Sequence, residues 1–235
     1  MCGKFTQQFT WAEYCRLAGT GTDAAAGDLP DAMDPGTMLG KATPMANVPV
    51  LHLGPMRQRR LTAMRWGWYN ENSLKPERTF SHLHARSDRI DIAPTWSDAF
   101  RERRGVVFAT EFNIGEELPN GRVRQWVCSD PEHSPLAIAV IYSVWDVIPR
   151  RVCTFAMVTT DACAPIHEKD DRMPALLGLD EVATWIGETG AGTAELKALL
   201  RPYSGILVMR PQEQDKERNT TRTRRPPKEP EPTLF

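Results

Sequence analysis

The sequence predicts an α+β fold built on a curled antiparallel or mixed β-sheet, or an open barrel, with helices at its periphery. The strand candidates follow one another along the chain with few helical segments between them. Turn signals at Gly54-Pro55 and Asn120-Gly121 separate strand candidates in the way that hairpins require. The 235 residues, 41% of them hydrophobic, are enough to bury one full core.

The first elements are a short helix and a hairpin. Thr10 and Glu13 have the spacing of a capping box and Gly19 is a stop signal, which predicts a helix at about 11–18. Residues 20–40 are rich in Gly, Ala, Asp and Pro and are predicted to form an excursion loop. The apolar and aromatic runs 48–53 and 61–69 are predicted strands that pair across the Gly54-Pro55 turn.

The later elements are mostly strands. Thr95 is the expected cap of a second helix that ends at Gly105. Strands are expected at 106–114 and 122–128, joined through a tight Asn-Gly turn. The remaining predicted elements are strands at 136–143, 152–160 and 206–209 and helices at 180–186 and 194–200.

The composition changes after Arg210. Residues 1–210 are expected to form one domain, whereas 211–235 hold five prolines and eleven charged residues and are expected to be a disordered tail. The tail ends in the apolar pair Leu234 and Phe235. Such a pair on a charged segment can dock in a partner's pocket.

We expect a cytoplasmic protein that is a monomer. No apolar run approaches a membrane span and the start of the chain lacks the pattern of a signal peptide. The five cysteines form no CxxC pair, so neither a disulfide framework nor a metal site is expected, and no cofactor is assigned. The formal net charge is −1, but two groups of arginines are suited to phosphates or to a solvated surface: Arg57, Arg59 and Arg60, and Arg101, Arg103 and Arg104.

Cys2 is the most informative residue. A methionine followed by a small residue is normally trimmed, and removal of Met1 would leave a thiol and an α-amine on adjacent carbons. An α-amine titrates near pH ~8 and a thiol near ~8.5, so both have reactive fractions at neutral pH. Such an aminothiol can condense with an aldehyde to a thiazolidine. On position alone, Cys2 is equally compatible with an inert residue at a frayed terminus.

Four segments together resemble the SRAP family, the SOS-response-associated peptidase domain. They are Met1-Cys2-Gly3-Lys4-Phe5, Arg65-Trp66-Gly67-Trp68, His84-Ala85-Arg86-Ser87-Asp88, and Ile166-His167 with Asp171-Arg172-Met173-Pro174. The family's patterns are Met-Cys-Gly-Arg-Phe, Arg-Trp-Gly, Asn-Ala-Arg-Ser/Ala-Glu and Ile-His-Asp-Arg-Met-Pro. Each motif alone is weak, but their order is specific, and the resemblance covers about residues 1–210.

The resemblance implies a β-rich barrel-like fold that binds single-stranded DNA at abasic sites. It implies a thiazolidine crosslink between the N-terminal cysteine and the ring-opened sugar, and a peptidase activity that removes the residue before that cysteine. Two alternatives remain open. One is an N-terminal-nucleophile thiol hydrolase, and the other is a single-stranded DNA-binding protein without covalent chemistry.

The resemblance also assigns catalytic candidates. Cys2 matches the family's nucleophile, and His167 matches a histidine that can donate a proton to the sugar ring oxygen. Four residues separate His167 from Arg172 where the family has one. His84 stands where the family has asparagine, and it adds a titratable proton.

The family's catalytic glutamate is displaced. Its Gly-Phe-Tyr-Glu-Trp segment corresponds to Glu111-Phe112-Asn113-Ile114-Gly115, which sets Ile114 at the glutamate. Proton shuttling during imine formation needs a carboxylate. The candidates to replace it are Glu111, Glu116 and Glu117, and otherwise these acids are solvated hairpin charges.

The DNA-binding candidates follow from the same motifs. Arg86 and Arg172 match arginines suited to phosphate, and Lys4 keeps the charge of an arginine without its bidentate geometry. Trp66 and Pro44 match apolar positions that can stack on bases or wedge between them. The C-terminal Leu234 and Phe235 resemble the apolar tip of a bacterial sliding-clamp-binding peptide, and this resemblance implies the clamp as a partner.

Overall fold

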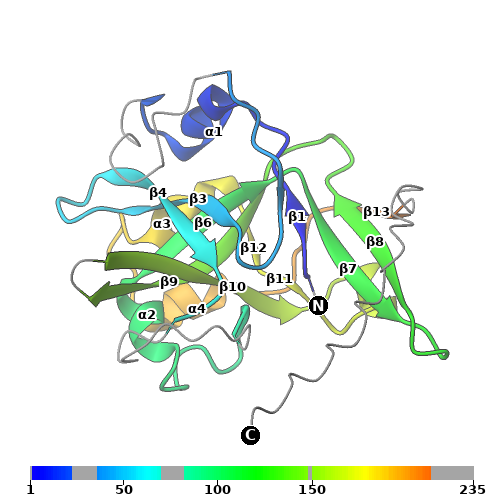
Figure 1. The fold of residues 1–235 in the computed structure, drawn as a ribbon. Coiled ribbons are helices and arrows are strands. Elements are labelled where there is room, and N and C mark those ends of the chain that lie inside the picture. The colour runs from blue at the N-terminus through cyan, green and yellow to red at the C-terminus, as the bar shows by residue number, and fades with distance from the viewer. Residues whose placement is uncertain (1, 23–35, 70–81, 148–149, 213–235) are drawn as a thin grey trace, which may run out of the picture.

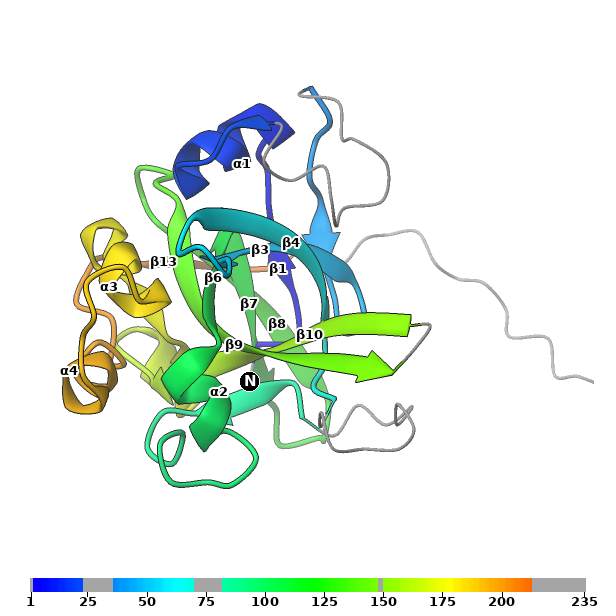
Figure 2. The ribbon, with the colours of Figure 1, turned by 90° about the vertical axis from the view of Figure 1, so that its left-hand side faces the viewer.

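A computed structural model describes residues 2–22, 36–69, 82–147 and 150–212. These residues form a barrel of strands with a second sheet beside it and short helices around the outside (Figures 1 and 2). The predicted fold class is therefore confirmed. The predicted loop at 20–40 falls largely outside the described residues, as does the predicted tail with Leu234 and Phe235.

Five strands make the barrel. Neighbouring strands pair in the order β10, β4, β3, β6 and β9, and β9 pairs back onto β10, which closes the ring. Their bounds are β3 Asn47–Leu53, β4 Arg59–Trp66, β6 Arg104–Ala109, β9 Leu136–Val147 and β10 Arg150–Asp161. The β4–β10 pairing is parallel and the other four are antiparallel.

Three short strands extend the barrel sheet. They are β5 His84–Arg86, β11 Arg172–Pro174 and β12 Leu176–Leu177. β5 runs parallel to β10 and β11 runs antiparallel to it, and both reach Thr159, which is paired with Arg86 on β5 and with Pro174 on β11. This arrangement brings the His84 and Arg172 motifs to the same end of β10.

The second sheet carries the N-terminus. Its order is β13, β8, β7, β1 and β2, with bounds β1 Phe5–Thr6, β2 Lys41–Ala42, β7 Glu111–Glu117, β8 Val123–Ser129 and β13 Val208–Pro211. Figure 1 shows this sheet at one side of the barrel, with the N-terminus next to β7 and close to the ends of β10 and β11.

The helices are short and lie outside the barrel (Figure 2). They are α1 Trp11–Ala18, α2 Ser97–Glu102, α3 Val182–Ile186 and α4 Thr193–Ala198, together with the 3-10 helices Ile166–Glu168 and Leu179–Glu181. The predicted capping box of α1 is present, because the Glu13 amide donates to Thr10 Oγ1 and the Glu13 carboxylate accepts from the Thr10 amide. No described helix has the length and apolar character needed to cross a membrane.

Two predicted boundaries were wrong. The expected strand 106–114 is divided at Thr110 into β6 and β7, which belong to different sheets. Thr95 does not cap α2, whose N-cap is Trp96, and the helix ends before Gly105 because Arg104 already begins β6. The Arg104 guanidinium is buried and donates to the carbonyls of Phe100 and Trp185.

The buried apolar residues form two clusters. One lies between the barrel and the helices and includes Trp11, Phe100 and Trp185. The other joins the barrel interior to the second sheet and includes Cys2, Trp66 and Ile114. Cys2 is therefore part of the core rather than of a frayed terminus.

Candidate active site around Cys2

Pairing with β7 fixes the start of the chain. Phe5 and Thr6 pair with Phe112 and Glu111, and the Asn113 amide donates to the Lys4 carbonyl at 2.9 Å. This ladder holds the segment that leads to Cys2 beside β7 in the second sheet. Cys2 is 1% exposed.

The Cys2 thiol is protonated at neutral pH in this arrangement. Its Sγ–H donates to the Lys4 carbonyl at 3.3 Å. Burial raises the pKa of the thiol from its ordinary 9.0 to about 11. Because the thiolate is the nucleophile, reaction at this sulfur needs a group that accepts the proton or a step that exposes the sulfur.

His84 forms a hydrogen bond with the backbone of Cys2. Its Nε2 lies 2.7 Å from the Cys2 carbonyl oxygen, which can only accept, so Nε2 carries the proton. β5 positions the imidazole by pairing His84 with Met157 of β10. Burial lowers the pKa of His84, which favours the neutral ring.

Trp66 packs against the His84 imidazole. It is fully buried, its ring centroid lies 5.2 Å from that of Phe5 and 6.1 Å from that of His84, and its indole N–H donates to the Leu83 carbonyl. Gly67 follows with φ +138°, a conformation that favours glycine. The tryptophan therefore packs under the site.

The three glutamates expected to replace the displaced carboxylate lie on different faces of β7. Glu111 lies on the same face of β7 as Asn113, and its carboxylate forms an ion pair with Arg210 at 2.6 Å. Glu117 lies on that same face and is exposed. Glu116 shares the face of Ile114, which is fully buried, and its carboxylate accepts from the Trp126 indole at 2.9 Å and pairs with Lys169 at 3.3 Å. The Trp126 hydrogen bond and then Lys169 lower the pKa of Glu116.

Asp170 is a carboxylate that the sequence reasoning missed. It lies in the loop before β11, where its amide donates to the Ile166 carbonyl and its Oδ1 accepts from the Arg172 amide at 3.1 Å. Burial is the largest influence on both pKa values, and it raises that of Cys2 and lowers that of His84. The negative charge of Asp170 acts in addition and raises the pKa of each residue. Counting two residues back from Arg172, as the family's His-x-Arg spacing does, would have led to Asp170 rather than to His167.

His167 lies at the surface. It is the middle residue of the 3-10 helix Ile166–Glu168, its amide donates to the Cys163 carbonyl, and its side chain is exposed. The longer loop between His167 and Arg172 accommodates this helix and the turn at Asp170.

The residues predicted to bind DNA have different environments. Arg86 is exposed and pairs with Asp88 at 3.1 Å, and Lys4 is half-buried with its Nζ donating to Gln212 Oε1. Arg172 is 4% exposed and donates to Asp161 Oδ1 at 2.5 Å and to the Thr159 carbonyl at 2.6 Å. Pro44 is half-buried in the loop that ties onto β4 through the Met45 amide and the Trp66 carbonyl.

Several arginines of the two basic clusters make contacts within the protein. Arg59 forms a two-point ion pair with Glu188, and Arg57 donates to the Gly187 carbonyl, so both hold the end of α3. Within the part of the chain that the structure describes, no group of His, Cys, Asp and Glu side chains has the arrangement of a metal site.

Comparison with known proteins gives one family. A family model described as SOS response associated peptidase (SRAP) matches residues 1–215. Two proteins of Bacillus subtilis (strain 168) are similar in sequence: abasic site processing protein YoaM, 23% identical over 61% of this chain, and abasic site processing protein YoqW, 22% identical over 61%. These matches span 64% and 65% of the two relatives.

Solved structures show the same fold. A Bacteroides thetaiotaomicron protein aligns with a TM-score of 0.72 and 17% identity over 91% of this chain and 93% of its own. A Bordetella bronchiseptica protein aligns with a TM-score of 0.69 and 16% identity over 91% of this chain and 100% of its own.

Proposed function

Because this chain belongs to the SOS response associated peptidase (SRAP) family, we propose that it processes abasic sites in single-stranded DNA by forming a thiazolidine crosslink through Cys2. The observation that carries the proposal is the grip of His84 on the Cys2 carbonyl, at 2.7 Å, in a site where Asp170 is within electrostatic reach of both residues. The names of the two Bacillus relatives, which describe abasic site processing, support the same substrate.

The proposed reaction begins with removal of Met1, in which hydrolysis of the Met1–Cys2 peptide bond consumes one water and frees the α-amine. The amine adds to the aldehyde carbon of the ring-opened sugar, and loss of one water gives an imine. The Cys2 sulfur then attacks the imine carbon, a C–S bond forms, the thiol proton leaves the sulfur, and the nitrogen gains a proton. The product is a five-membered ring, and condensation releases one water in total.

His84 and Asp170 supply the proton transfers in this scheme. His84 holds the Cys2 carbonyl with Nε2–H, which orients the amine and the sulfur toward the same carbon. Asp170 accepts the proton that the buried thiol must lose, in place of the family's glutamate. Glu116 serves this role less well because Trp126 and Lys169 already bind its carboxylate.

DNA binding in the proposal depends on exposed cations near this site. Arg86 and Lys4 contact phosphates, since both side chains reach solvent. Trp66 and Arg172 act as positioning residues, because the indole lies under His84 and the guanidinium joins β11 to β10. Pro44 and the exposed His167 remain candidates for contact with the strand at the lesion.

The buried thiol favours a second candidate function. A protonated sulfur with 1% exposure suits a protein that binds single-stranded DNA without covalent chemistry. That function predicts salt-sensitive binding that Cys2→Ala leaves unchanged and no adduct.

The test is incubation with a single-stranded oligonucleotide that carries one abasic site, followed by denaturing electrophoresis. Wild type should give a heat-resistant adduct, and Cys2→Ser should give none without a reductant. The variant keeps the α-amine, so borohydride should still trap its imine. Cys15→Ala, a change at a buried thiol of α1, is the matched control and should crosslink like wild type. Equal adduct from wild type and Cys2→Ser would refute the proposal.

A further inference from the structure

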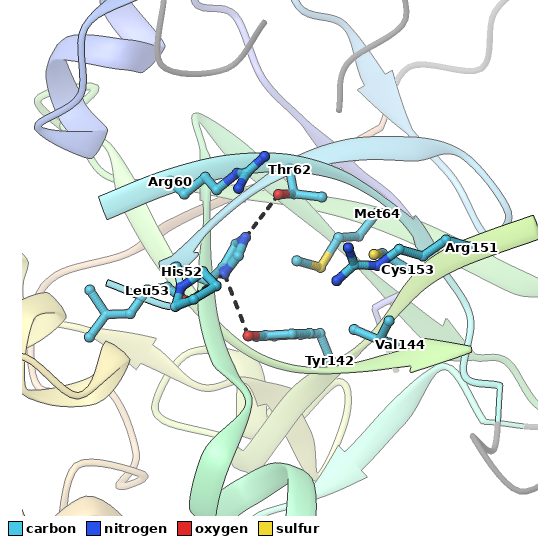
Figure 3. A pocket seen from close by; sticks show the side chains of 11 residues that line it. His52, Leu53, Arg60, Thr62, Met64, Tyr142, Val144, Arg151 and Cys153 are labelled. Atoms are coloured by element: carbon cyan, nitrogen blue, oxygen red, sulfur yellow. Dashed lines mark hydrogen bonds between the residues drawn. The ribbon is translucent and has the colours of Figure 1, made fainter. Parts of the chain in front are cut away.

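A cavity of about 320 Å³ lies at one end of the barrel, and Figure 3 shows the side chains that line it. Its walls come from β3, β4, β9 and β10. Along β10, Arg151 precedes Met157, the partner of His84, by six residues, or roughly 20 Å of extended strand. The cavity is therefore separate from the candidate active site.

Polar side chains take inward positions at this end of the barrel. On β4 the inward residues are Arg60, Thr62, Met64 and Trp66, so the lining changes from apolar in the core to polar at the mouth. Inward positions of small barrels are filled by side chains or enclose one small ligand, and a buried polar side chain there costs folding free energy unless it is hydrogen-bonded. This polar layer therefore calls for a functional explanation.

The neutral wall of the cavity is preorganised. His52 is 8% exposed, and its two ring nitrogens lie 2.9 Å from Thr62 Oγ1 and from the Leu53 carbonyl. The Tyr142 hydroxyl lies 3.5 Å from His52 Nδ1, as Figure 3 shows. Burial raises the pKa of Tyr142, so its phenol keeps its proton and can donate to a ligand.

The charged side chains that line the cavity are both arginines. Arg60 and Arg151 contribute guanidinium groups from β4 and β10, and the eleven lining residues in the described part of the chain include no carboxylate. Asp146 lies opposite Arg151 in the strand register and on the same face of β9 as Tyr142 and Val144, so its exposed carboxylate flanks the rim next to Arg151, outside the eleven lining residues. Met64 and Val144 add apolar surface to the lining of the cavity (Figure 3).

We propose that this barrel mouth binds a small organic phosphate monoester of about the size of one nucleotide. Two guanidinium groups and a phenolic donor match a dianionic phosphate head better than a carboxylate with one charge. Met64 and Val144 contact the apolar body of the ligand. The volume lies at the lower end of the range for small-molecule pockets, which limits the occupant to one unit.

Calorimetric titration of the full-length protein with deoxythymidine monophosphate tests this site. Wild type should bind, and thymidine, which lacks the phosphate, should bind at least tenfold more weakly. Arg60→Gln, Arg151→Gln and Tyr142→Phe should each weaken binding several-fold, and the double arginine variant should abolish it. Arg16→Gln, at an exposed arginine of α1, is the control and should bind like wild type.

A competition arm identifies the source of the phosphate. A 5′-phosphorylated oligonucleotide that displaces the nucleotide indicates a DNA terminus, and failure to displace it indicates a free nucleotide. The proposal is overturned if wild type does not bind the nucleotide at millimolar concentration, or if the double arginine variant, folded by its thermal unfolding, binds as wild type does. The arginine variants should keep wild-type crosslinking, because the cavity is separate from Cys2.

Discussion

The Cys2 thiol is buried and donates a hydrogen bond to the Lys4 carbonyl, so its reactivity depends on neighbouring groups. At the position that the motif comparison assigns to the family's glutamate, β7 carries the buried Ile114, which cannot take a proton. Asp170 comes from a different loop and acts electrostatically on both Cys2 and His84. In this chain, the proposed carboxylate therefore comes from the loop before β11 instead of from β7.

Single substitutions separate the candidate carboxylates. Asp170→Asn should slow adduct formation by roughly 10²-fold or more, because loss of a general base typically costs that much. Glu116→Gln and Glu111→Gln should change the rate by less than about threefold, since both carboxylates are held in other contacts. Rates of denaturation-resistant adduct measure this directly, and a slower Glu116→Gln than Asp170→Asn would transfer the role to Glu116. His84→Asn, which restores the family's residue, tests whether the imidazole is required.

The buried thiol also makes stability depend on alkaline pH. The unfolded chain loses the Cys2 proton near its ordinary pKa of 9.0, whereas the folded protein keeps it until about 11. The free energy of unfolding should therefore fall as pH rises through this window, by up to ~1.4 kcal/mol per pH unit from this group. Urea unfolding of wild type and Cys2→Ala between pH 8 and 11 measures the difference, and parallel profiles would contradict it.

At the scale of elements, β11 is joined to β10 by Arg172. Its guanidinium is buried between the Asp161 carboxylate and the Thr159 carbonyl, and the loop that carries Asp170 enters the same strand. Arg172 therefore acts on the proposed active site through the position of that loop. The exposed Arg86, on the other flank of β10, is the natural comparison.

Arg172 and Arg86 should differ in what their loss affects. Arg172→Ala should lower the free energy of unfolding by ~2 kcal/mol, because it removes the charge-assisted hydrogen bonds that a buried guanidinium makes to Asp161 and to the Thr159 carbonyl. Arg86→Ala should leave stability within about 0.5 kcal/mol, since its ion pair is exposed, and should weaken single-stranded DNA binding with a shallower salt dependence. Denaturant unfolding and binding isotherms at several salt concentrations provide both readouts, and a stable Arg172→Ala would contradict the structural role.

Element types were predicted better than their connections. The capping box at Thr10 and the turn at Gly54 are local signals, and both produced the expected elements. The break between β6 and β7 was missed because the run from Val106 to Ile114 is apolar enough for one continuous strand, while the division depends on pairing with β9 and β1 far along the chain. Arg104 was placed on a surface because its burial depends on α3, which lies about 80 residues later.

At the scale of the whole molecule, closure of the barrel by β9 and β10 gathers one set of residues around Cys2 at one end and a second set around the cavity at the other end. At one end β10 pairs with β5 and β11, which brings His84 and the Asp170 loop to Cys2. At the other end the inward positions are polar and form the cavity at His52. The ordered motifs predicted that Cys2 and His84 work together, whereas Asp170 was not predicted. The cavity was not predicted, because its residues have ordinary strand spacing and meet only when the barrel closes.

The most direct test of the Cys2 proposal is mass spectrometry of the crosslinked peptide. After reaction with an abasic oligonucleotide and digestion of protein and DNA, the modified peptide should begin at Cys2, lack Met1, and have the summed mass of peptide and sugar fragment less one water. Fragmentation should place the added mass on the first residue. A modified peptide that retains Met1, or an adduct on a lysine or an internal cysteine such as Cys163, would contradict the account.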